Sequence, residues 1–133
     1  MAIEDGAMGE LMRETVVANV LAYVAAWNEP DAAARLSILS GCWADDAVYV
    51  DPNVELKGRT ALVQHISKVQ SGRPGARIEV MSGIDLHHNV LRFLWRLKRA
   101  DGNAGDISID FGEVDANGKL TKIAGFFGET PSM

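Results

Sequence analysis

The sequence predicts an α+β domain in which helices cover one face of a curved antiparallel sheet. Two observations lead to this fold class. Apolar residues recur at helical spacing in three segments of the first half of the chain, and the second half consists of strand-like runs separated by turn sequences. A length of 133 residues, with 47% hydrophobic residues, is typical of one globular domain, here residues 1–133.

Three helices are predicted from apolar residues spaced three and four apart. The first is Leu11–Trp27, which ends at an Asn-Glu-Pro-Asp sequence because a residue before proline avoids helical conformation. Asp31 is the expected N-cap of the second helix, Ala32–Leu39. The third is Thr60–Val69, and a Ser-Gly-Arg-Pro-Gly sequence ends it.

The remaining segments have the residue composition of strands. One short strand, Ala47–Asp51, lies between the second and third helices. Four longer runs follow the third helix and are joined by turns such as Asp-Gly-Asn and Asn-Gly, which indicate a meander: Arg77–His87, Asn89–Arg99, Asp106–Val114 and Lys119–Phe127.

The predicted strands carry apolar residues on both faces. Leu91, Phe93, Trp95 and Leu97 form one apolar face of their strand, yet Val90 and Leu94 lie on its other face. In the next strand, Ile107, Ile109 and Phe111 lie on the face opposite to that of Asp110. The helices can cover only the concave face. We therefore expect a homodimer through the convex face of the sheet.

Composition narrows the possible partners and locations. A net charge of −5 argues against nucleic acid as a partner, because binding it requires a basic face. Cys42 is the only cysteine, so an intrachain disulfide is impossible and a cytoplasmic protein is expected. Residues 1–10 lack the apolar core of a signal peptide, and no apolar run reaches membrane-spanning length, so no membrane partner is expected.

Three polar residues lie on otherwise apolar segments: Tyr23, Asp51 and Asp110. Because burying an unpaired carboxylate is costly, two aspartates in such positions indicate a cavity inside the fold. A phenol and two carboxyl groups on one cavity could transfer protons. Each of the three residues also has a purely structural interpretation. Tyr23 could be a core aromatic residue, Asp51 could close a strand-ending turn with Pro52, and Asp110 could pair with a nearby arginine or histidine.

A metal site is not expected. The adjacent His87 and His88 point to opposite faces of a strand, and no other histidine or cysteine has the spacing of metal ligands. Which of the two histidines faces the cavity stays open, although counting alternate residues along the strand puts His87 on the same face as Trp95.

Several short motifs, in order along the chain, resemble the SnoaL-like branch of the nuclear transport factor 2-like (NTF2-like) superfamily, which includes the ketosteroid isomerases. They are Tyr23–Asn28, Trp43–Pro52, Gly58-Arg59, His87-His88 before the strand with Arg92 and Trp95, Asn117–Lys119 and Gly125–Glu129. The resemblance implies a cone: a bent sheet wrapped around a long helix, with a pocket at the open end.

The resemblance also implies roles for the three polar residues. Asp51 matches the general base of the isomerases, while Tyr23 and a protonated Asp110 match the pair that stabilises the enolate. The segment Asp31–Trp43 is longer than in the isomerases, and His65 stands where they have an apolar or aromatic residue. The expected substrate-binding residues are Trp27, Trp43, Tyr49, His65, His87, Trp95 and Phe127.

The leading hypothesis is a proton-transfer enzyme for a small, largely apolar carbonyl compound, of the ketosteroid isomerase type. It needs no cofactor, because the protein supplies every reacting group. A related possibility is a SnoaL-like polyketide cyclase, in which one carboxyl such as Asp110 does the acid–base work. The alternative from another class is a binding protein that holds an apolar ligand without turnover. An epoxide hydrolase is disfavoured, because Arg92-Phe93-Leu94 lacks the required aspartate.

Overall fold

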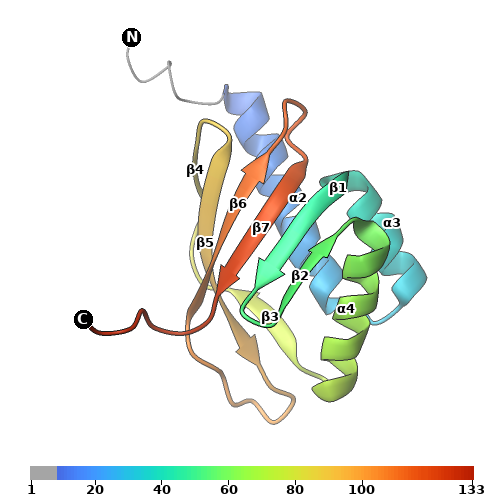
Figure 1. The fold of residues 1–133 in the computed structure, drawn as a ribbon, viewed down its shortest axis with the longest axis vertical. Helices are drawn as coiled ribbons and strands as arrows, with labels where there is room; N and C mark the ends of the chain where they lie inside the picture. The colour runs from blue at the N-terminus through green and yellow to red at the C-terminus, as the bar shows by residue number, and fades with distance from the viewer. Residues whose placement is uncertain (1–8) are drawn as a thin grey trace.

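Three helices lie against one face of a bent seven-stranded sheet in the computed structural model, which describes residues 9–133 (Figure 1). The expected α+β, cone-shaped architecture is confirmed. The prediction that residues 1–10 contain no signal segment falls almost entirely outside the described residues.

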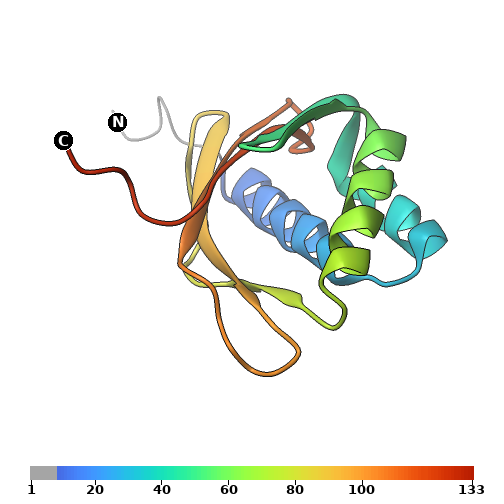
Figure 2. The ribbon, with the colours of Figure 1, turned by 60° about the horizontal axis from the view of Figure 1, so that its bottom comes forward.

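The three predicted helices are present and extend slightly beyond their predicted ends. They are α2 (Glu10–Asn28), α3 (Ala32–Cys42) and α4 (Arg59–Gly72). Asp31 caps α3 as expected, since its carboxylate accepts a 2.8 Å hydrogen bond from the backbone N–H of Ala34. Figure 2 shows α2 running inside the curve of the sheet, with α3 and α4 beside it.

The sheet is mostly antiparallel, with the order β2-β1-β7-β6-β5-β3, and β4 pairs with β5. Its strands are β1 (Trp43–Asp51), β2 (Val54–Lys57), β3 (Arg77–Val80), β4 (Asp85–His87), β5 (Val90–Lys98), β6 (Ser108–Val114) and β7 (Leu120–Phe126).

Two features of the sheet differ from the prediction. Strands β1 and β7 pair in parallel, so the sheet is mixed rather than wholly antiparallel. The sequence pattern also missed β2, which forms a hairpin with β1. The turn of this hairpin is closed by Asp51, whose Oδ1 accepts hydrogen bonds from the backbone N–H groups of Asn53 and Val54 at 2.8 and 3.2 Å.

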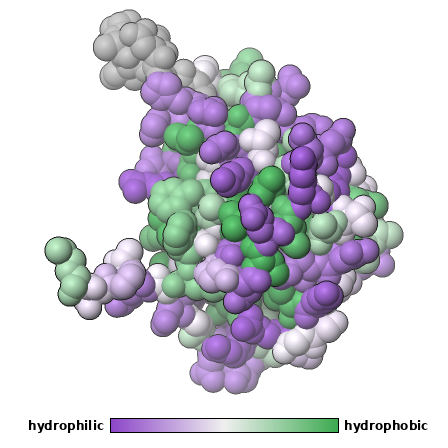
Figure 3. All heavy atoms as spheres, viewed as in Figure 1, coloured by the Kyte–Doolittle hydropathy of each residue, from purple (hydrophilic) through white to green (hydrophobic). Residues whose placement is uncertain are grey.

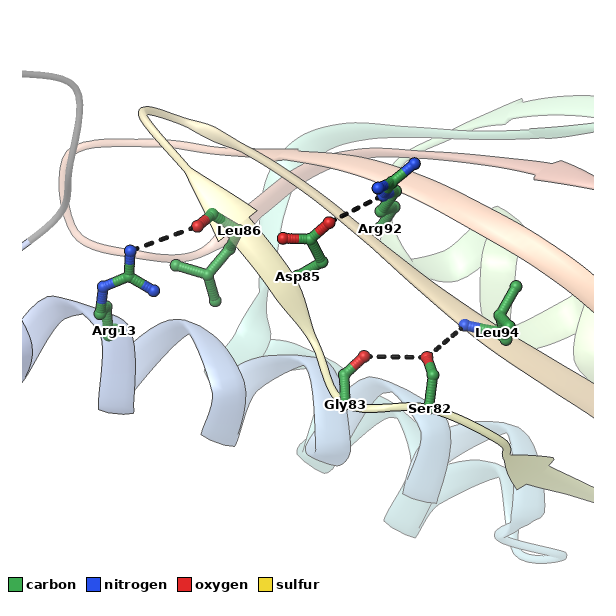
Figure 4. Close-up of polar contacts among 7 residues, drawn as sticks. All are labelled: Arg13, Ser82, Gly83, Asp85, Leu86, Arg92 and Leu94. Atoms are coloured by element: carbon green, nitrogen blue, oxygen red, sulfur yellow. Dashed lines mark hydrogen bonds and ion pairs between the residues drawn. The ribbon is translucent and has the colours of Figure 1, made fainter. Parts of the chain in front are cut away.

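The predicted strand Arg77–His87 is interrupted between β3 and β4 by a side chain that takes the place of a backbone acceptor (Figure 4). The N–H of Leu94 donates to the hydroxyl of Ser82 at 2.8 Å, and this hydroxyl in turn donates to the carbonyl of Gly83. The chain then resumes pairing at Asp85, which forms a 2.8 Å ion pair with Arg92. Arg13 of α2 donates to the carbonyl of Leu86, which ties β4 to the helix.

The core lies between α2 and the inner face of the sheet, and includes fully buried side chains from both, such as Val16, Val20, Leu120 and Ile123. The outer face carries no helix (Figure 1). Figure 3 views this face and shows hydrophobic side chains among charged ones in its middle.

Candidate functional site

A cavity of about 420 Å³ opens between α2, α4 and the inner face of the sheet. Such a volume is typical of sites for small organic molecules. Its walls include all three polar residues singled out in the sequence, Tyr23, Asp51 and Asp110. Their arrangement follows from the register of the strands that carry them.

Asp51 and Asp110 lie two strands apart, with Gly125 between them. Asp110 on β6 pairs with Gly125 on β7, and β1 runs parallel to β7 with Val50 opposite Ala124, so Asp51 comes beside Gly125. Strand spacing puts the two aspartate α-carbons about 10 Å apart.

Gly125 leaves room for this pair of carboxyl groups. A β-carbon at this position would lie 2.9 Å from Oδ1 of Asp110 and 3.7 Å from the β-carbon of Asp51. Any other residue would therefore displace the carboxyl of Asp110. The two acids share one part of the cavity because the residue between them has no side chain.

Both oxygens of the Asp51 carboxylate accept hydrogen bonds. Oδ1 receives the two backbone N–H groups of the β1–β2 turn, and Oδ2 receives the hydroxyl of Tyr49 at 2.6 Å. Donors on both oxygens fix the orientation of this carboxyl group in the cavity wall. Tyr49 is itself buried. Burial is the main cause that raises the pKa of its phenol, and the hydrogen bond to Asp51 raises this pKa further. The phenol therefore remains a neutral donor.

Asp110 has the opposite environment. Its side chain is buried, with 6% of the residue exposed, and burial raises the pKa of its carboxyl to about 7. A hydrogen bond from Trp95 lowers this pKa, but by less than burial raises it. The Trp95 indole N–H donates to Oδ1 at 2.9 Å. The negative charge of Asp51 raises the pKa further. Below about pH 7 this carboxyl is therefore protonated and can act as a hydrogen-bond donor.

Tyr23 is 2% exposed and stacks on Trp43, with ring centroids 5.5 Å apart. Burial raises the pKa of its phenol well above the usual value, and the charge of the nearby Asp110 adds to this effect. The phenol thus stays protonated throughout the physiological pH range.

Aromatic side chains form two walls of the cavity. Trp27, Tyr49 and His65 form one cluster, with centroid separations of 5.5 to 5.9 Å. Burial lowers the pKa of His65, so this ring is neutral. Trp95 and Phe127 meet edge to face at 5.8 Å on the opposite side.

Two of the expected substrate-binding residues lie away from the cavity. Trp43 is completely buried behind Tyr23 at the start of β1, and its indole N–H has no hydrogen-bond partner among residues 9–133. His87 is exposed at the end of β4, where it pairs with Val90 and points to the outer face. The alternation of residues had put His87 on the same face as Trp95. The two-residue turn that begins at His88 breaks this alternation, because it pairs His87 with Val90, which lies on the face opposite Trp95. His88 does not line the cavity either.

Other lining residues were missed, although their spacing marks them. Val69 on α4 and Arg73 just after it follow His65 at intervals of four. Phe93, Leu97 and Arg99 alternate with Trp95 along β5 and beyond its end. Ser108, two residues before Asp110, is also buried, and its hydroxyl accepts a 3.0 Å hydrogen bond from the N–H of Gly128. That bond holds the segment containing Phe127 against the cavity.

Within residues 9–133, no group of three or more His, Cys, Asp or Glu side chains is arranged to hold a metal ion. The helices in the same range are all too short or too polar to cross a membrane.

Comparison with solved structures identifies relatives of this fold. A SnoaL-like family protein from Agrobacterium tumefaciens, provisionally assigned as an isomerase, is 28% identical, with a TM-score of 0.81 over 87% of this chain and 99% of that one. A provisionally assigned SnoaL-like polyketide cyclase from Jannaschia sp. CCS1 is 12% identical, with a TM-score of 0.66 over 85% of each chain. An NTF2-like protein of unknown function from Burkholderia xenovorans is 20% identical, with a TM-score of 0.64 over 92% of this chain and 90% of that one.

No family model matches the chain, and no curated protein has significant sequence similarity to it. The structural similarity is nevertheless extensive and includes a relative that aligns over nearly its whole length. These similarities give the chain the NTF2-like fold and support its place in the SnoaL-like/NTF2-like superfamily.

Proposed function

We propose that this protein is a proton-transfer enzyme that acts on a small, largely apolar carbonyl compound, in the manner of a ketosteroid isomerase. The observation that carries the proposal is the contrast between two acids on one cavity. Asp51 is a carboxylate held by three hydrogen bonds, whereas Asp110 is a buried acid with a pKa of about 7. Two carboxyl groups in such different environments are the usual basis for assigning a base and an acid.

In the proposed reaction, Asp51 removes a proton from the carbon next to the carbonyl group. Charge then develops on the carbonyl oxygen, where the neutral side chains of Asp110 and Tyr23 donate hydrogen bonds. Asp51 returns the proton to a second carbon, which completes an isomerisation without a cofactor. The hydrogen bond from Tyr49 orients the carboxylate of Asp51 through the cycle.

Steroid- and polyketide-like carbonyl compounds are the proposed substrate class. Trp27, Trp95 and Phe127 provide flat apolar surfaces on opposite sides of the cavity, which suit fused rings. Two related proteins are provisionally assigned as an isomerase and a polyketide cyclase, in agreement with this class. If the protein is a cyclase, Asp110 alone would transfer the protons.

Turnover of a 5-ene-3-keto steroid, followed by the absorbance of the conjugated product, tests the proposal. We expect Asp51→Asn to lower kcat by about 10²–10⁴-fold, because an amide cannot act as a general base. Asp85→Asn is the matched control, since Asp85 is an exposed aspartate outside the cavity and should leave kcat unchanged. Binding of the steroid without turnover in the wild type would instead favour a ligand-binding protein.

The assembly and the location of the protein belong to the same proposal. A homodimer through the outer face of the sheet would cover the apolar side chains exposed there, including Phe111 and Phe126. The cytoplasmic location stays a prediction from the single cysteine, Cys42.

A further inference from the structure

Two arginines lie at one end of the cavity, remote from the carboxyl groups. Arg73 and Arg99 both line the cavity, and both side chains are exposed. They come from different elements: Arg73 follows α4, and Arg99 follows β5. Neither takes part in the proton transfer described above, so their position on the cavity wall needs another explanation.

Each arginine lies in line with residues that point into the cavity. His65 and Val69 on α4 and Arg73 just after it are four apart, which puts Arg73 about 12 Å from His65 along the direction of the helix. On β5 Phe93 pairs with Asp110, and Arg99 comes six residues later on the same face, about 20 Å along the strand. Both walls therefore run from the inner residues to a guanidinium group.

The two walls meet at their arginine-bearing ends. A β-carbon on Gly75, two residues after Arg73, would lie 2.8 Å from the β-carbon of Ala100, the residue after Arg99. This close approach holds the loop after α4 against the β5–β6 hairpin. Arg73 and Arg99 consequently share the mouth of the cavity rather than lying at separate openings.

Both arginines are free to bind an anion. Three other arginines form ion pairs, Arg59 with Asp45, Arg92 with Asp85 and Arg96 with Glu79, whereas neither Arg73 nor Arg99 has a carboxylate within 4.0 Å among residues 9–133. Asp106 also lines the mouth but forms no ion pair with them. Two guanidinium groups without a carboxylate partner among the described residues favour an anion at this position.

We propose that the natural ligand carries a carboxylate at the end opposite its reacting carbonyl group. Its apolar body lies between the aromatic walls, its carbonyl oxygen faces Asp110 and Tyr23, and its carboxylate binds Arg73 and Arg99. This inference names the substrate class of the proposed function and rests on it only for the orientation of the ligand. An arginine pair suits a planar carboxylate, since guanidinium groups donate two parallel hydrogen bonds to it.

Two naphthols that differ only in charge test the proposal: 3-(6-hydroxy-2-naphthyl)propanoic acid and its methyl ester. The hydroxyl group mimics an enol, and the acid is ionised at pH 7. Calorimetric titration at low salt should show at least tenfold tighter binding of the acid than of the ester. In the double variant Arg73→Gln/Arg99→Gln this preference should fall below twofold, while the affinity for the ester stays the same.

The double variant Arg77→Gln/Lys98→Gln is the matched control. It removes the same charge near the same end of β5, from two residues that pair across β3 and β5 and do not line the cavity. Retention of the acid preference in this control, with its loss in the arginine variant, supports direct contact. Equal affinity for acid and ester in the wild type, absence of binding by both, or an equal effect of the two double variants overturns the proposal.

A further variant separates this inference from the proposed function. Asp110→Asn should weaken binding of the acid and of the ester by the same factor, because it alters the contact with the hydroxyl group alone. A wild-type protein that prefers the acid but turns over no carbonyl compound would refute the proposed enzyme and leave the carboxylate site standing.

Discussion

Asp110 makes the stability of the protein depend on pH. Burial raises the pKa of its carboxyl to about 7, whereas an aspartate in an unfolded chain has a pKa of about 3.9. At a pH between these two pKa values, the carboxyl of Asp110 is protonated in the folded protein and ionised in the unfolded chain. The contribution of Asp110 to the free energy of unfolding is therefore greatest below pH 4 and falls by about 4 kcal/mol as the pH rises to 7.

We expect Asp110→Asn to remove this pH dependence, because the amide is neutral at every pH and its oxygen can still accept from Trp95. Urea unfolding of the wild type and the variant at pH 4.5 and pH 8 measures the free energy of unfolding of each. The variant should gain stability relative to the wild type at pH 8, and much less at pH 4.5. Equal differences at both pH values would mean that Asp110 titrates as an exposed aspartate.

Single residues of the site were predictable from the sequence where their chemistry conflicts with their surroundings. Asp110 stands out because a carboxyl is unusual in the middle of an apolar strand. The hydrogen bond between Tyr49 and Asp51 was implicit in their spacing, since residues two apart on a strand share a face. Gly125 gave no such signal, because its importance depends on what lies on the two neighbouring strands.

The helical layer is held together by one buried arginine. Arg35 of α3 is 1% exposed, and its guanidinium donates to the carbonyls of Glu29 and Val63 and to the side chains of Ser67 and Gln70. It thereby joins the end of α2 to α4, the two helices that carry Trp27 and His65. Nothing in the amphipathic pattern of α3 distinguishes this residue from an exposed arginine.

Replacing Arg35 with methionine should destabilise the protein by about 3 kcal/mol or more, because several buried acceptors lose their donor. Chemical denaturation followed by tryptophan fluorescence gives the value. Arg77→Met, at an exposed arginine on β3, is the control and should change the free energy of unfolding by less than about 0.5 kcal/mol. A loss for Arg35→Met as small as that of the control would contradict the assigned role.

Elements with a clear periodicity were predicted well, whereas irregular pairing was not. Leu11–Trp27 differs from α2 by one residue at each end. The strand β2 has only four residues, too few for a pattern, and its existence depends on the turn at Asp51. The break before β4 arises because the Ser82 hydroxyl replaces a backbone acceptor, a tertiary contact that no local pattern reports.

At the scale of the whole molecule, the outer face of the sheet exposes a cluster of apolar side chains. Phe111 and Phe126 meet edge to face at 5.9 Å there and are 43% and 57% exposed. Leu94 on β5 and Ile109 on β6 lie in one row across the sheet with Phe126 on β7, and Phe111 lies in the neighbouring row. An apolar surface spread over three adjacent strands is typical of an interface.

We expect light scattering at micromolar concentration to give twice the 14.4 kDa mass of one chain. Phe126→Glu should yield a folded monomer, as judged by circular dichroism, because a charge in the middle of an apolar interface is left unpaired. Leu11→Glu is the control: Leu11 is 80% exposed on α2, and the variant should remain dimeric. A wild-type mass of one chain would refute the dimer.

The position of β7 has a consequence for how the protein is made. This strand follows every other strand of the sheet along the chain, yet it lies between β1 and β6 and contributes Gly125 between the two acids. A nascent chain that has not yet released β7 from the ribosome has a sheet in two unconnected parts, each with an unpaired edge. Completion of the sheet is thus delayed until β7 has left the ribosome, and a chain truncated before Leu120 would expose those edges to aggregation.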